Sequence, residues 1–160
     1  MVCPSLVVID GRDLGRVYSE TNGGWSARGP LLAIQFFKRH GVECVALLRR
    51  ELMAGVTTQD EFYSALQEAR STRSISEIPP NAKANTFILK HAIDRNAHVV
   101  TNKHLGGLVG CKESLELLAQ TEQDLRAYLC RNIVSYTFTR DEFVPNPQAP
   151  LIRTLKHVAP

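Results

Sequence analysis

Two carboxylates three residues apart are the clearest sign of chemistry in this sequence. Asp10 and Asp13 follow Leu6-Val-Val-Ile9, a short β-branched run that predicts a buried strand. Carboxylate oxygens are the ligands that Mg²⁺ prefers, and an acidic residue directly after a strand is also typical of a helix N-cap. The pair therefore leaves two interpretations open, a divalent metal site and a helix cap.

A second group of polar residues follows another predicted strand. Asn102, Lys103 and His104 come directly after the run at residues 98–101. The carboxyl ends of parallel strands lie at one edge of a sheet, where ligands bind in open α/β folds. We therefore expect this group to meet Asp10 and Asp13 at that edge.

Several common sites are excluded by their missing motifs. The sequence contains no G-x-G-x-x-G, P-loop, G-x-S-x-G or H-E-x-x-H pattern, and its histidines lack ligand spacing. The cysteines show no C-x-x-C spacing, so the sequence indicates neither a zinc site nor a disulfide framework. This cysteine usage favours a reducing compartment. These cysteines are Cys3, Cys44, Cys111 and Cys130.

Length and charge are those of one globular domain with an uneven basic surface. The chain has 160 residues, 44% of them apolar, and no apolar run long enough to span a membrane. The net charge of +3 is concentrated, because residues 27–50 carry +4 and residues 70–112 carry +5. These segments predict either a phosphate-facing patch or ordinary solvated helix faces.

Predicted strands alternate with predicted helices along the chain. Strands are expected at 6–9, 44–48, 74–78, 98–101 and 134–138, and helices at 30–40, 57–69, 85–94, 113–119 and 122–131. Such alternation predicts an α/β fold with a doubly wound parallel sheet covered by helices on both faces. An extended, proline-rich tail is expected from Phe143.

Several segments together resemble a known family, the NYN (PIN-like) ribonuclease domain of the Regnase group. They occur in family order from Leu6 to Val158, at residues 7–11, 28–37, 87–90, 98–102 and 135–145. The resemblance implies a PIN-like three-layer α/β/α sandwich with a central, mainly parallel sheet. It also implies descent from Mg²⁺-dependent endoribonucleases. We expect residues 1–160 to form one such domain, excised from a longer chain.

The resemblance also implies that the active site is degenerate. Asp10 matches the first aspartate of the family, and Asp13 matches a polar residue that is usually asparagine. Aspartates are absent from four further family positions, which are Ala84, Asn85, Lys103 and Gly107 here. We expect no intact catalytic set and no metal or other cofactor, with the Lys103 ammonium paired to Asp10 in place of a cation.

The resulting hypothesis is a pseudo-ribonuclease that acts as a binding and dimerisation subunit in RNA silencing or messenger-RNA decay. Its expected partners are a catalytically active NYN protein or a second copy, and RNA, but no membrane. The expected location is the cytoplasm, including RNA granules. Two alternatives remain: an active endoribonuclease with an unusual Mg²⁺ site built on Asp10, Asp13, Asn85 and Asn102, and a stand-alone RNA-binding module.

Two surfaces are predicted to serve these roles. The RNA-binding residues are expected to be Arg28, Arg49 and Arg50, which match basic positions of the family. The dimer interface is expected in the tail or the neighbouring helix, because the prolines of the tail are predicted to keep its apolar side chains out of regular core. The predicted interface residues are Phe143, Val144, Leu151, Ile152 and Leu155.

Overall fold

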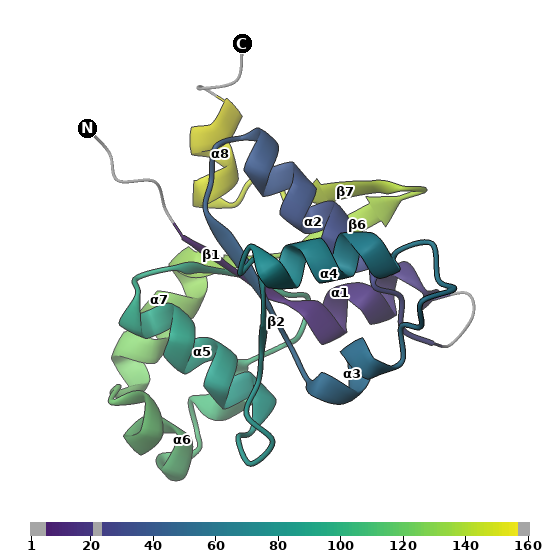
Figure 1. Cartoon of the computed structure of the whole chain (residues 1–160). Coiled ribbons are helices and arrows are strands. Elements are labelled where there is room, and N and C mark those ends of the chain that lie inside the picture. Colours follow the sequence, from purple (N-terminus) through teal and green to yellow (C-terminus); the bar gives the residue numbers. More distant parts are fainter. Residues whose placement is uncertain (1–5, 21–23, 157–160) are drawn as a thin grey trace.

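The computed structural model describes residues 6–20 and 24–156, which build a five-stranded parallel sheet. Its strand order is β3-β2-β1-β4-β5. Figure 1 labels β1 and β2 of this sheet and the helices packed around it. The strands are β1 (Val7–Asp10), β2 (Cys44–Leu48), β3 (Ile75–Glu77), β4 (His98–Val100) and β5 (Ile133–Val134). All neighbouring strands of this sheet run parallel, which confirms the predicted sheet.

Helices cover both faces of the sheet in three layers. One face packs against helices α1 (Gly11–Tyr18), α2 (Arg28–Arg39), α4 (Tyr63–Ser71) and α8 (Pro150–Lys156). The other face packs against α5 (Ala84–Asp94), α6 (Lys112–Leu118) and α7 (Glu122–Asn132). A short helix α3 (Arg50–Ala54) and a 3₁₀ turn at Gly106–Leu108 complete the chain. The predicted α/β/α sandwich is therefore confirmed.

The central strand β1 shows why the sequence begins with an unbroken apolar run. Val7 and Ile9 point into the core on one face of the sheet, and Val8 points into the core on the other. All three side chains are fully buried. A parallel strand covered on both faces has no solvent side, so its residues do not alternate with polar ones.

Helix α1 was not among the predicted helices, although the helix-cap interpretation of Asp10 is compatible with it. Two of its eight residues are glycines, which disfavour helix. The structure explains both. A Cβ on Gly11 would lie 2.4 Å from Leu48 Cδ2, and a Cβ on Gly15 would lie 2.1 Å from Trp25 Nε1. The glycines thus allow close tertiary packing, which outweighs their poor local propensity.

The predicted strand at 134–138 is interrupted at Ser135. Residues before it belong to β5, whereas β6 (Tyr136–Thr139) pairs antiparallel with β7 (Glu142–Pro145) in a separate two-stranded sheet. Arg140, in the connecting turn, has a φ of 57°, in the left-handed region. Residues 134–138 therefore contribute to two sheets rather than to one strand.

The prediction that the tail stays out of the core is wrong. The side chains of Phe143, Leu151, Ile152 and Leu155 are buried in the core beneath α2, and Val144 is half-buried. The prolines sit where proline is tolerated: Pro145 ends a strand and Pro150 begins α8. The four buried side chains therefore pack within the domain itself, and the dimer interface expected at the tail stays a prediction.

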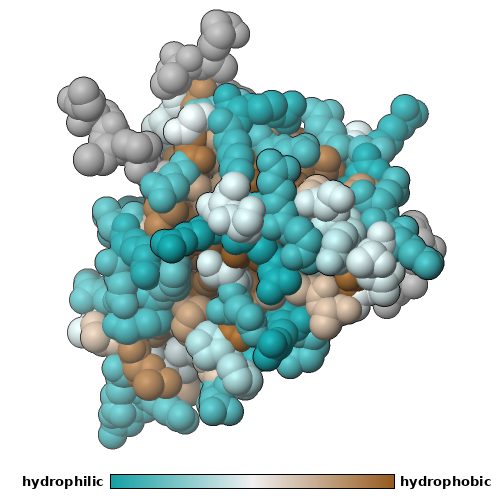
Figure 2. Space-filling view, in the orientation of Figure 1, coloured by the Kyte–Doolittle hydropathy of each residue, from teal (hydrophilic) through white to brown (hydrophobic). Residues whose placement is uncertain are grey.

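Three further features bear on the sequence expectations. No helix within the described residues is long and apolar enough to cross a membrane. Cys44, Cys111 and Cys130 are free thiols, whereas Cys3 and the histidine and valine at 157 and 158 lie outside the described residues. The face shown in Figure 2 is mostly hydrophilic, with a small hydrophobic patch low on the side that carries α6.

Candidate functional site

Asp10 and Asp13 lie at the junction of β1 and α1 and are 2% and 1% exposed. Asp10 is the N-cap of α1, because its Oδ1 atom accepts a hydrogen bond from the backbone N–H of Asp13 at 3.3 Å. A carboxylate at this position satisfies a free amide and interacts favourably with the helix dipole. The helix-cap interpretation of Asp10 is confirmed.

The Asp13 carboxylate is surrounded by hydrogen-bond donors from two other segments, the loop after β4 and strand β6. Its Oδ2 atom accepts from the backbone N–H of Asn102 at 2.8 Å and from the Tyr136 hydroxyl at 2.7 Å. On α1 itself, Arg16 Nη2 lies 3.6 Å from Asp13 Oδ1. Burial, and then the hydrogen bond to Asp13, raise the pKa of Tyr136, so its hydroxyl remains a donor. Asp13 is therefore held as a structural anion at the centre of the fold.

Replacing Tyr136 by phenylalanine should lower the free energy of unfolding by about 1–2 kcal/mol, because Asp13 loses one buried donor. Denaturant unfolding measures the change. Tyr63→Phe is the matched control, because the Tyr63 hydroxyl makes no hydrogen bond among the described residues. Equal stabilities for the two variants would contradict the role assigned to the Tyr136 hydroxyl.

Lys103 closes the site above Asp10. Its Nζ atom lies 3.1 Å from Asp10 Oδ2 and 3.4 Å from Asn85 Oδ1, and its side chain is 23% exposed. The Thr101 hydroxyl donates to the same Asp10 oxygen at 3.1 Å. The ion pair expected between Lys103 and Asp10 is confirmed, as adjacent parallel strands require for residues that follow β1 and β4.

These residues do not match the donor set that a divalent cation requires. Mg²⁺ binds several oxygen ligands and is favoured by concentrated negative charge. Here both carboxylates already have other partners, and the Lys103 ammonium lies beside the Asp10 oxygen that faces the site. Among the residues that the structure describes, no three acidic, histidine or cysteine side chains come together as a metal-binding group.

The four positions where the family pattern has aspartate all line one cavity of about 660 Å³. Ala84 and Asn85 come from the first turn of α5, and Lys103 and Gly107 come from the loop after β4. Basic side chains from other elements line the same cavity: Arg12, Arg16, Arg49 and Lys83. The structure therefore brings the predicted remnant positions together, but in basic surroundings.

Of the three predicted RNA-binding arginines, only Arg49 lines this cavity. Arg28 pairs with Asp141 at 3.3 Å and lies over the ring of Phe62. Arg50 is largely exposed and lies 3.9 Å from Glu77. Arg28 and Arg50 therefore lie outside the cavity, with acidic partners of their own.

Sequence reasoning missed the supporting residues of the site. Arg12 and Arg16 are one turn apart on α1, so their shared face follows only once that helix is recognised. Thr101 carried a signal, because it is a polar residue at the end of a buried strand and beside Asn102. Tyr136 belongs to the segment 135–145 that resembles the family, but its contact with Asp13 could not be read from the local sequence.

The family assignment comes from comparison with known proteins. Residues 4–159 match the family described as the Zc3h12a-like ribonuclease NYN domain. This chain belongs to that family. The match covers almost all of the 160 residues, and it agrees with the resemblance found in the sequence motifs.

Solved structures support the fold of this NYN domain. Arabidopsis thaliana nuclear protein-only RNase P 2 (PRORP2) is similar with a TM-score of 0.71 and 18% sequence identity over 92% of this chain. A second crystal structure of PRORP2 from A. thaliana gives a TM-score of 0.69 at 18% identity, over 90% of this chain. The NYN domain spans only 31% and 30% of those chains. Comparison with curated protein sequences gives no significant match.

Proposed function

We propose that this NYN domain is a pseudo-ribonuclease, which binds RNA without cleaving it. It would act as a binding subunit in RNA silencing or messenger-RNA decay, beside a catalytically active NYN protein or a second copy of itself. The observation that carries the proposal is the 3.1 Å contact between Lys103 Nζ and Asp10 Oδ2. That contact gives the first aspartate of the family pattern an ammonium partner.

The electrostatics of the site support loss of metal-dependent chemistry. Nucleases that use a metal rely on it to activate water and to stabilise the leaving oxygen. The residues at 84, 85, 103 and 107 together replace four expected negative charges and add one positive charge. A divalent cation beside Asp10 would be repelled by Lys103. Displacing Lys103 would break its ion pair with Asp10 and leave the ammonium without that partner.

The same electrostatics favour retention of RNA. The lining of the cavity is rich in lysine and arginine, and RNA binding depends strongly on contacts between such side chains and phosphates. The cavity is also lined by the four positions that the family resemblance assigns to active-site aspartates. A cavity with basic or neutral residues at the family's aspartate positions would bind RNA phosphates but would not hold the metal ion needed for cleavage.

The test is a combined binding and cleavage assay on single-stranded and stem-loop RNA in Mg²⁺ and in Mn²⁺. We expect a mobility shift of intact RNA and no products, with affinity that falls as salt rises. Asp10→Asn serves as the matched variant, because it removes the one carboxylate that every metal-dependent scheme needs. Cleavage by the unmodified domain that disappears in Asp10→Asn would establish the active endoribonuclease instead.

The proposed role as a subunit beside a partner protein can be tested with the same protein preparation. Size-exclusion chromatography with light scattering, alone and mixed with an active NYN protein, should show a species larger than the monomer. A strictly monomeric domain that still binds RNA would contradict the subunit role and favour a stand-alone RNA-binding module.

A further inference from the structure

The cavity of about 660 Å³ above Asp10 is lined by basic and neutral residues and by no acidic side chain. Its bases come from α1, from the end of β2, from the start of α5 and from the loop after β4. They are Arg12, Arg16, Arg49, Lys83 and Lys103. Convergence of one charge sign from four segments of the chain is the property of an anion site rather than of a solvated helix face.

Three of these bases have carboxylate partners outside the lining. Lys103 pairs with Asp10 at 3.1 Å, Arg16 with Asp13 at 3.6 Å, and Lys83 with a glutamate of α6 at 3.8 Å. Their charges are therefore largely balanced within the domain. The excess charge of the cavity comes from its remaining two bases.

Arg12 and Arg49 have no acidic partner among the residues that the structure describes. The Arg49 guanidinium is held by neutral backbone carbonyls, with Nη2 2.6 Å from the oxygen of Ala82 and Nη1 3.3 Å from that of Pro79. These bonds fix its position without cancelling its charge. Two unbalanced positive charges thus face one cavity.

The start of α5 adds backbone N–H donors, which carry partial positive charge, to the basic side chains of the cavity. Ala84, Asn85 and Thr86 line the cavity from the first turn of this helix. The turn contains no acidic residue and no side chain caps it. The first amides of a helix lack partners within the helix and carry its positive dipole end, so they favour an anion.

We propose that this cavity binds the terminal phosphate of an RNA strand, a phosphomonoester, directly and without a divalent ion. A phosphomonoester carries close to two negative charges near neutral pH, which balances Arg12 and Arg49, whereas a backbone phosphodiester carries one. The inference deepens the proposed function and rests on it, because a bound Mg²⁺ would require Lys103 to leave.

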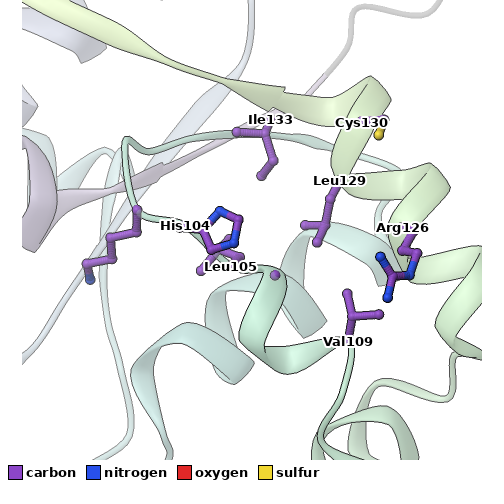
Figure 3. Close-up of a pocket in the computed structure, with 9 residues that line it drawn as sticks. His104, Leu105, Val109, Arg126, Leu129, Cys130 and Ile133 are labelled. Carbon is purple, nitrogen blue, oxygen red and sulfur yellow. The ribbon is translucent and has the colours of Figure 1, made fainter.

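A neighbouring hollow of about 390 Å³ offers a place for the base beside that phosphate. Lys103 lines both spaces, and the hollow is largely apolar, with Leu105, Leu129 and Ile133 in its walls (Figure 3). His104 and Arg126 border it with planar groups on which a base can stack. This surface distinguishes the end of a strand from free inorganic phosphate.

The experiment measures binding of short single-stranded RNA by fluorescence anisotropy in EDTA. Three oligonucleotides of one sequence carry a 5′-phosphate, a 3′-phosphate, or hydroxyls at both ends. We expect one phosphorylated form to bind at least tenfold more tightly than the hydroxyl form, because the site gains charge-assisted hydrogen bonds. The preferred arm identifies which end of the strand is recognised.

Arg12→Ala should remove most of this preference, and Arg39→Ala is its matched control. Both are exposed helical arginines, but Arg39 ends α2, outside the cavity lining. Equal binding of all three oligonucleotides, or binding that EDTA abolishes, would overturn the proposal. So would equal behaviour of the two variants, or inorganic phosphate competing as well as the phosphorylated strand. RNA cleavage in Mg²⁺ or Mn²⁺ would contradict the pseudo-ribonuclease but not this proposal. The preference for a phosphorylated strand end is tested separately, by comparing Arg12→Ala with the unmodified domain in EDTA.

Discussion

A variant that combines Ala84→Asp, Asn85→Asp, Lys103→Asp and Gly107→Asp is expected to gain a divalent metal site. All four positions line the cavity above Asp10, and a side chain at Gly107 would meet no atom within 4 Å. With Mg²⁺ about a hundredfold above its Kd, binding should stabilise this variant by about 2.7 kcal/mol. That corresponds to a rise in Tm of roughly 5–10 °C relative to EDTA.

The physical reason is the sign of the charge beside Asp10. The substitutions remove the ammonium now 3.1 Å from its Oδ2 atom and add carboxylates around the same space. Without metal, those carboxylates repel one another, so the variant in EDTA should be less stable than the unmodified domain. Metal binding relieves that repulsion, which makes the difference between Mg²⁺ and EDTA large.

The control carries asparagine in place of each introduced aspartate, as Ala84→Asn, Lys103→Asn and Gly107→Asn, with Asn85 unchanged. It keeps similar shape without the charge and should show a much smaller response to Mg²⁺. A comparable rise in Tm for the unmodified domain would mean that it already binds metal, against the proposed function. No response in the aspartate variant would mean that the cavity lacks the geometry of a metal site.

Gly29→Ala is expected to destabilise the domain by about 3 kcal/mol, at the upper end of the range for overpacking a core. A Cβ at this position would lie 2.4 Å from the backbone oxygen of Leu14 and 2.7 Å from its carbonyl carbon. Backbone atoms cannot rotate away as a flexible side chain can, so α1 and α2 must move apart. Because α1 carries Asp13, the shift should also disturb the site.

Thermal unfolding should show this as a Tm lower by roughly 6–12 °C. Gly110→Ala is the matched control, because a Cβ there would meet no atom within 4 Å and its backbone has no positive φ. Its stability should stay within about 0.5 kcal/mol of the unmodified domain. A mild effect of Gly29→Ala, similar to that control, would show that the two helices can separate at little cost.

The parallel sheet was predictable because its strands are read from local composition. The runs at β1, β2 and β4 are short and mostly apolar, as is typical of strands buried on both faces of a sheet. Their parallel arrangement places Asp10, at the end of β1, near the residues after β4. Together with the family resemblance, which assigns Lys103 to an aspartate position, this predicted the contact between Asp10 and Lys103.

What the sequence did not reveal depends on contacts between distant segments. Gly11 and Gly15 argue locally against α1, and only the packing of Leu48 and Trp25 makes them suitable there. With α1 missing, Arg12 could not be placed in the cavity. The prediction for the tail was wrong because its prolines were interpreted as obstacles to packing. In the structure Pro145 ends a strand and Pro150 begins a helix, where proline is tolerated.

The position of β1 has a consequence for how the chain is made. Of the five strands of this sheet, the one synthesised first is the middle strand, β1, which lies between β2 and β4. Its second neighbour therefore appears only with residues 98–100. The aromatic face of α2 is covered even later, because its Phe36 and Phe37 pack against Phe143 of β7. Pairings between such remote segments make folding slow. The nascent domain therefore emerges with an open strand edge and an uncovered apolar helix, and it completes its core only once β7 and α8 have been made.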